Sequence, residues 1–200
     1  MIELDASLPP ELVPLSWLIG VWEGSGIVNY PVDGEMRQVE FGQRLSFSHD
    51  GLPYLNYTSY AWVDDAAGVH NPLVSETGYW RLGRKLTDGD PGPGMLPGVG
   101  TPPFDSADAV EALRNEDHGF DLEVSIIHPG GVSELYLGQL NGPRIDLVTD
   151  AVMRSASAKE HSASSRLYGL VDKHLLWAWE IAALGSKLIS HASGRLARVD

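Results

Sequence analysis

The stretch VEFGQRLSFS, residues 39–48, alternates between two kinds of residue with a period of two. Phe41, Gln43, Leu45 and Phe47 fall on one side of the chain, and charged, small or hydroxyl residues fall on the other. This pattern is typical of a β-strand that buries one face in a core. The opposite face of such a strand is expected to meet solvent.

The same alternation recurs along most of the chain, in runs that are separated by short polar turns such as HDG at 49–51 and NGP at 141–143. Besides residues 39–48, strands are expected at 20–30, 54–63, 75–82, 120–127, 132–139, 144–149, 164–171, 175–183 and 194–199. Consecutive strands with hairpin-length connections predict an antiparallel meander. A series of about ten such strands can stack as a sandwich or close into a barrel, and closure removes the exposed edges. We therefore predict an all-β fold, a closed antiparallel up-and-down barrel of about ten strands.

Two further segments depart from the alternation. Residues 9–18 place Leu12, Leu15 and Leu18 at helical spacing after two prolines, which predicts a short N-terminal helix that plugs one barrel mouth. Residues 88–117 are rich in Pro and Gly and cannot form a helix or a central strand over most of their length. Their end, from Ser106 to Leu113, predicts a short helix capped by Ser106. The length of 200 residues favours one domain, 1–200, with this insertion, and we favour a surface or disordered loop over a functional lid.

Composition excludes several classes of function. The net charge of −13 argues against nucleic acid and anionic membrane surfaces as partners. The chain has no Cys, which excludes disulfides, thiolate catalysis, Cys-ligated zinc and iron–sulfur clusters. The N-terminal residues do not resemble a secretory signal, and the longest apolar runs are too short to span a bilayer. We therefore expect a cytoplasmic protein, in which any metal is held by His, by a carboxylate or by a cofactor ring.

The run Gly20-Val21-Trp22-Glu23-Gly24-Ser25-Gly26 opens the first expected strand. Glycines weaken a strand, so Gly20, Gly24 and Gly26 need a packing reason, such as a bend or a close backbone approach. Trp22 is expected to cover the closed end of the barrel from between them. We interpret this run as structural rather than catalytic.

Several blocks of the sequence, taken in order, resemble the nitrobindins, a family of haem-binding ten-stranded β-barrels that are described as peroxynitrite isomerases. The run from Gly20 to Gly26 matches the G-x-W-x-G-x-G signature of that family. The other matching blocks are Asn29-Tyr30-Pro31, Ser75 to Arg81, His128 to Gly131 leading into Glu134 to Gly138, Ala158-Lys159-Glu160, and Ala182 to Gly185 followed by Leu188 and His191. The chain departs from the family at Val32, where Thr is common, and at Lys187, where Pro is common.

The resemblance implies a b-type haem (heme b) in one mouth of the barrel, with His191 as the only protein ligand of the iron. A neutral imidazole is a usual proximal haem ligand. Lys159 is the position at which a cation would pair with a haem propionate. The resemblance also implies conversion of peroxynitrite to nitrate at the ferric haem, and binding or sensing of nitric oxide as a close variant. No catalytic residue beyond the haem iron is implied.

The sequence also allows functions other than haem binding. The barrel shape also suits a carrier of a fatty acid or other lipophilic ligand without haem, which would use a buried Arg to receive a carboxylate. Arg44 is expected to face outward, as is Glu180. Of the remaining His residues, His161 is expected to be solvated, and His128 is expected to shape a turn. The chain lacks a G-x-S-x-G elbow, which argues against a hydrolase. Whether two copies form a homodimer is left open.

Overall fold

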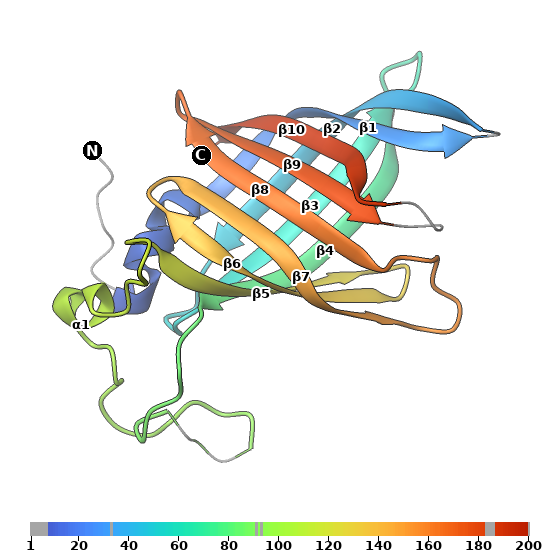
Figure 1. Ribbon diagram of the computed structural model, residues 1–200. Helices are drawn as coiled ribbons and strands as arrows, with labels where there is room; N and C mark the ends of the chain where they lie inside the picture. Colours follow the sequence, from blue (N-terminus) through green and yellow to red (C-terminus); the bar gives the residue numbers. More distant parts are fainter. Residues whose placement is uncertain (1–7, 33, 91, 93, 183–186, 200) are drawn as a thin grey trace.

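The computed structural model describes residues 8–32, 34–90, 92, 94–182 and 187–199. Ten antiparallel strands form a closed barrel in which each strand pairs with its neighbours in sequence and the first pairs with the last (Figure 1). The strands are β1 Gly20–Val32, β2 Glu35–Ser48, β3 Leu55–Asp64, β4 His70–Leu82, β5 Phe120–His128, β6 Val132–Asn141, β7 Arg144–Arg154, β8 Ala163–Val171, β9 His174–Ala182 and β10 Ile189–Val199. The predicted fold class is therefore confirmed. The last residue of the strand expected at 175–183 lies outside the described residues.

One end of the barrel is closed by η1, a 3-10 helix over Pro10–Leu18. Pro14 lies inside it and offers no backbone N–H, which disfavours an α-helix there. Leu12, Leu15 and Leu18 are fully buried, as a plug requires. The indole Nε1 of Trp22 on β1 donates a hydrogen bond of 2.7 Å to the carbonyl of Leu18, which ties the plug to the barrel wall. No helix among the described residues is long and apolar enough to cross a membrane.

The insertion between β4 and β5 lies at this closed end, next to η1 (Figure 1). It contains the short helix α1, Ala107–Glu111, and the hydroxyl of Ser106 accepts a hydrogen bond from the Ala109 amide, as its role of N-cap predicts. Val110 is 2 % exposed and belongs to the core. The guanidinium of Arg84 bonds the carboxylates of both Glu11 and Asp90, which fastens the start of the insertion to the plug. These contacts hold the start and the helix of the insertion at the closed end of the barrel.

The seam between β1 and β10 explains the glycines of the first strand. A Cβ added to Gly24 would lie 2.3 Å from the carbonyl oxygen of Arg195, and one added to Gly26 would lie 2.4 Å from that of Ser193. Only glycine allows the backbones of β1 and β10 to approach this closely. The two glycines therefore serve the closure of the barrel.

The mouth opposite η1 lies where β1, β3, β5, β7 and β9 end and where β2, β4, β6, β8 and β10 begin. Among the described strands, the register shifts by one residue at three places, on β4, β7 and β10, and each place lies in the half of the barrel near this mouth. Extra residues of this kind bend a strand and re-aim its side chains. The regular strand register is therefore interrupted in the half of the barrel near this mouth. The polar side chains of the interior lie in the same half.

Candidate functional site

His191 is the extra residue in the β-bulge on β10. Ser190 pairs with Glu180 and Ala192 pairs with Trp179, so His191 stands between them without a partner of its own on β9. The bulge turns the imidazole toward the indole of Trp179, with ring centroids 5.0 Å apart and planes nearly perpendicular. A strand without the bulge would point residues 191 and 192 to opposite faces.

The imidazole of His191 is held in a defined state. Its Nδ1 lies 3.0 Å from the backbone carbonyl oxygen of Asn29 on β1, and because a carbonyl only accepts, Nδ1 carries the proton and donates. Burial lowers the pKa of His191, and the bond to Asn29 opposes this only in part. The ring is therefore neutral at pH 7, and its lone pair resides on Nε2. This is the state in which a histidine binds a metal, with the second nitrogen fixed by a backbone carbonyl.

Trp179 is the centre of a group of rings beneath the mouth. Its indole lies parallel to the His128 ring at 5.8 Å, and the His161 ring lies 6.4 Å away. The guanidinium carbon of Arg166 lies over the indole, 4.4 Å from its centroid, in cation–π contact. Trp179 is thus the ring that His191, His128, His161 and Arg166 all approach.

Glu134 on β6 is the acceptor on which several of these groups converge. His128 Nε2 lies 2.8 Å from its Oε2, His161 Nε2 lies 2.7 Å from its Oε1, and the Ser164 hydroxyl donates to Oε1 at 2.5 Å. Burial by itself raises the pKa of Glu134. The bonds from His128 and His161, the charge of Arg166 and the bond from Ser164 together outweigh burial, and they hold the pKa of Glu134 well below its usual range. Glu134 is therefore an ionised carboxylate inside the barrel.

Arg166 on β8 is the buried cation of the interior, with an exposed fraction of 3 %. Its two terminal nitrogens reach the Glu76 carboxylate on β4, at 2.7 Å and 3.2 Å, and Nε donates to the Tyr136 hydroxyl at 3.0 Å. This pairing crosses the barrel between strands that do not touch in the sheet. A carboxylate ligand would have to displace Glu76 to reach this guanidinium.

The structure corrects two sequence expectations. His161 is not solvated but 9 % exposed, because the bond to Glu134 draws it into the barrel. His128 does not merely shape a turn, since its ring faces inward to the same carboxylate. Arg44 and Glu180 face outward, as expected, and bond to Glu23 and Ser165.

Lys159 lies on the segment between β7 and β8, at the same rim as His191. Its side chain is exposed, and its backbone carbonyl accepts a hydrogen bond of 3.2 Å from Arg154. The segment meets the end of β9 through Ser162, whose amide donates to the Ala182 carbonyl at 2.9 Å. The residues that follow Ala182 lead to β10 and His191. Residues 183–185 of the matching block Ala182 to Gly185 lie outside the described residues.

Sequence reasoning missed Glu76, Glu134 and Arg166. For Glu134, the alternation of the strand offered a signal. Glu134 falls on the same face of β6 as Tyr136 and Leu140, and that face is buried. Glu180, by contrast, stands in the opposite phase to Trp177 and Trp179 and faces solvent. A charged residue in the apolar phase of a strand is the one to examine.

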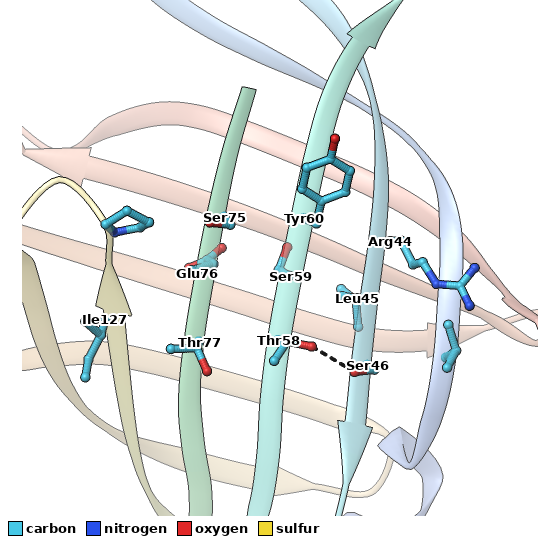
Figure 2. Close-up of a pocket in the computed structure, with 12 residues that line it drawn as sticks. Arg44, Leu45, Ser46, Thr58, Ser59, Tyr60, Ser75, Glu76, Thr77 and Ile127 are labelled. Carbon is cyan, nitrogen blue, oxygen red and sulfur yellow. Dashed lines mark hydrogen bonds between the residues drawn. The ribbon is translucent and has the colours of Figure 1, made fainter. Parts of the chain in front are cut away.

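A separate groove of about 620 Å³ lies on the outer wall over β2, β3 and β4 (Figure 2). Hydroxyl side chains line it, and the Ser46 and Thr58 hydroxyls lie 2.9 Å apart (Figure 2). Glu76 borders this groove, but His191 does not. The groove is therefore distinct from the mouth that holds the imidazole.

A closed ten-stranded barrel with one plugged end, and with a neutral imidazole fixed near the other, has the architecture of the small barrels that hold one ligand or cofactor. The chain belongs to the family of the THAP4-like, heme-binding beta-barrel domain, whose model matches residues 11–198. It is 63 % identical over 200 residues, all of both chains, to a protein of Clavibacter michiganensis subsp. michiganensis named peroxynitrite isomerase. It is 62 % identical, over the same share, to a protein of that name from Leifsonia xyli subsp. xyli.

The fold is also similar to a solved structure. The crystal structure of Rv2717c from M. tuberculosis superposes with a TM-score of 0.69 at 28 % sequence identity, covering 96 % of this chain and 99 % of that one. The similarity therefore extends over almost the whole barrel.

Proposed function

We propose that this protein is a haem-dependent peroxynitrite isomerase, which converts peroxynitrite to nitrate at a ferric b-type haem in the open mouth of the barrel. The observation that carries the proposal is the state of His191. Its Nδ1 donates to the Asn29 carbonyl, its ring is neutral, and Nε2 makes no hydrogen bond to a described residue. The donor set fits the group, because a single neutral imidazole is the ligand of many b-type haems. Relatives named peroxynitrite isomerase, with 63 % and 62 % identity, support the activity.

The side chains at the mouth have distinct roles in this proposal. His191 would hold the iron from one side, and Lys159 would pair with a haem propionate at the rim. Trp179 packs beside His191 and forms an apolar wall next to the imidazole. When bound, the ferric haem would supply the metal centre for the isomerisation. Nitric oxide would bind to the same iron.

Location and organisation belong to the same proposal. We place the protein in the cytoplasm as a single barrel domain that carries the insertion at 88–117. The absence of Cys is consistent with a reducing compartment.

The test is reconstitution of the haem-free protein with ferric hemin. The parent protein should develop a Soret band, and His191→Ala should abolish or shift it. His118→Ala is the matched control, because His118 is exposed and lies at the closed end. The loaded parent protein should accelerate peroxynitrite decay in stopped-flow measurements and raise the yield of nitrate. An unchanged spectrum for His191→Ala would remove His191 as the ligand.

The alternative function, a carrier of a lipophilic ligand without haem, predicts a different result. It needs a buried Arg that is free to receive a carboxylate, but Arg166 already pairs with Glu76. Lipid recovered in an organic extract of the purified protein, together with no uptake of hemin, would favour the carrier and overturn the haem proposal.

A further inference from the structure

The wall of the barrel is incomplete beside Lys159. β7 and β8 are joined by backbone pairing only from Arg144↔Gly169 to Val148↔Ser165. Beyond that point β7 continues to Arg154 and pairs with β6 alone. Residues 155–162, which connect β7 to β8, form no strand or helix. The position of this segment therefore depends on side-chain and turn contacts rather than on a ladder.

The contacts of the 155–162 segment are few and defined. At its start the Ser155 amide donates to the Gly131 carbonyl at 2.9 Å, and at its end the Ser162 amide donates to the Ala182 carbonyl. Between them, His161 is the only buried side chain of the segment, while Lys159 and its neighbour Glu160 are exposed. The bond of 2.7 Å from His161 Nε2 to Glu134 is thus the one inward attachment of the segment that holds Lys159.

Glu134 is well suited to hold this attachment. Its side chain is fully buried, it is ionised, and it accepts bonds from β5 and β8 as well as from His161. A hydrogen bond to a charged acceptor in a buried setting is stronger and more directional than one at the surface. The carboxylate is therefore a fixed point in the wall, and His161 lies two residues along the chain from Lys159.

We infer that His161 and Glu134 act as a positioning pair that sets the 155–162 segment at the rim so that Lys159 reaches the haem. This rests on the proposed role of Lys159 as the propionate partner. His161 does not touch the haem in this inference, and its effect passes through Lys159. Truncation of His161 would leave the segment of Lys159 attached only at its two ends and by the exposed bond from Arg154 to the Lys159 carbonyl.

A double-mutant cycle in hemin affinity tests the inference. We expect His161→Ala and Lys159→Met each to raise the dissociation constant of ferric hemin, measured by Soret titration, by about tenfold. The double variant should be no weaker than Lys159→Met alone, because both changes remove the same contact. His161→Gln, whose amide can still donate to Glu134, should restore most of the affinity.

His128→Ala is the matched control. It removes the other imidazole from the same carboxylate, yet His128 lies on β5 and has no hydrogen bond to the 155–162 segment. Its effect on hemin affinity should add to that of Lys159→Met. In the haem-free protein, hydrogen exchange at the amides of 155–162 should be faster in His161→Ala than in His128→Ala.

The outcomes separate the two levels of the proposal. If Lys159→Met leaves hemin affinity unchanged, the role of Lys159 fails and the positioning pair fails with it, while the role of His191 stands on its own spectrum. If Lys159→Met weakens hemin binding and the effect of His161→Ala adds to it in the double variant, only the positioning pair is overturned. The same follows if His161→Ala leaves hydrogen exchange at the amides of 155–162 unchanged.

Discussion

Arg166→Met removes a buried cation of the barrel and takes both guanidinium bonds away from Glu76. In the parent protein the guanidinium lies 2.7 Å from Glu76, 3.0 Å from the Tyr136 hydroxyl and 3.9 Å from Glu134. Methionine retains much of the side-chain volume but offers no donor, so Glu76 and Glu134 would share the interior without a counter-charge. Breaking a buried ion pair by removing one partner costs about 3 to 5 kcal/mol. We therefore expect the free energy of unfolding to fall by about 4 kcal/mol, close to a thousandfold in the unfolding equilibrium.

The assay is urea denaturation of the haem-free protein at pH 7, followed by tryptophan fluorescence. Arg144→Met is the matched control, because Arg144 makes an ion pair of the same length, 2.7 Å with Asp146, on the exposed surface. Solvent-exposed pairs contribute little, so this control should unfold almost as the parent does. Adding Glu76→Gln to Arg166→Met should recover part of the loss, since one buried charge is then gone. If Arg166→Met unfolds no more easily than Arg144→Met, the cluster does not stabilise the barrel and the reasoning fails.

Three further outcomes are expected. Gly24→Ala should lower the free energy of unfolding by about 2 kcal/mol, because its Cβ would meet the Arg195 carbonyl at 2.3 Å, whereas Gly130→Ala has open space and should cost far less in the same denaturation assay. Because the pKa of Glu134 is lowered by folding, the stability it contributes is present above its unfolded pKa of about 4.3 and is lost as the pH falls through the lower folded value. The stability difference between the parent and Glu134→Gln should therefore be larger at pH 7 than at pH 3.5, and a difference that grows on acidification would contradict this. Finally, the net charge of −13 repels anionic peroxynitrite, so added salt should speed its decay by the haem-loaded protein, and a slower rate would show that local cations at the mouth dominate.

The sequence predicted the closed half of the molecule well. There, apolar side chains such as Phe47 and Leu122 alternate strictly with outward-facing residues, because every strand meets the same core. The expected strands 75–82 and 144–149 stop short of the observed β4 and β7, which extend toward the mouth. In those extensions most side chains are exposed on both faces, so the period of two disappears although the backbone remains extended.

The candidate site was only partly predictable for a related reason. His191 came from the family resemblance, since nothing in its immediate sequence marks a bulge. Lys159 came from the same source. The partners that surround them come from strands far apart in sequence, such as Glu134 on β6 and Arg166 on β8, and a local pattern cannot pair residues across a barrel. His161 was misjudged because its neighbours are polar, and only the buried carboxylate explains why it turns inward.

The bulges and the buried charges lie toward the same mouth of the barrel. On β4, β7 and β10 an extra residue interrupts the ladder near the mouth, and β7 loses its pairing with β8 just beyond Val148. Between β7 and β8 backbone pairing no longer joins the wall there, and side chains from β4, β5, β6 and β8 link the interior through Glu134 and Arg166. A mouth held by side chains can be shaped for a ligand without disturbing the ladder that closes the rest of the barrel. The bulge on β10 also turns the His191 imidazole toward Trp179, so the imidazole and the buried charges occupy the same end of the barrel.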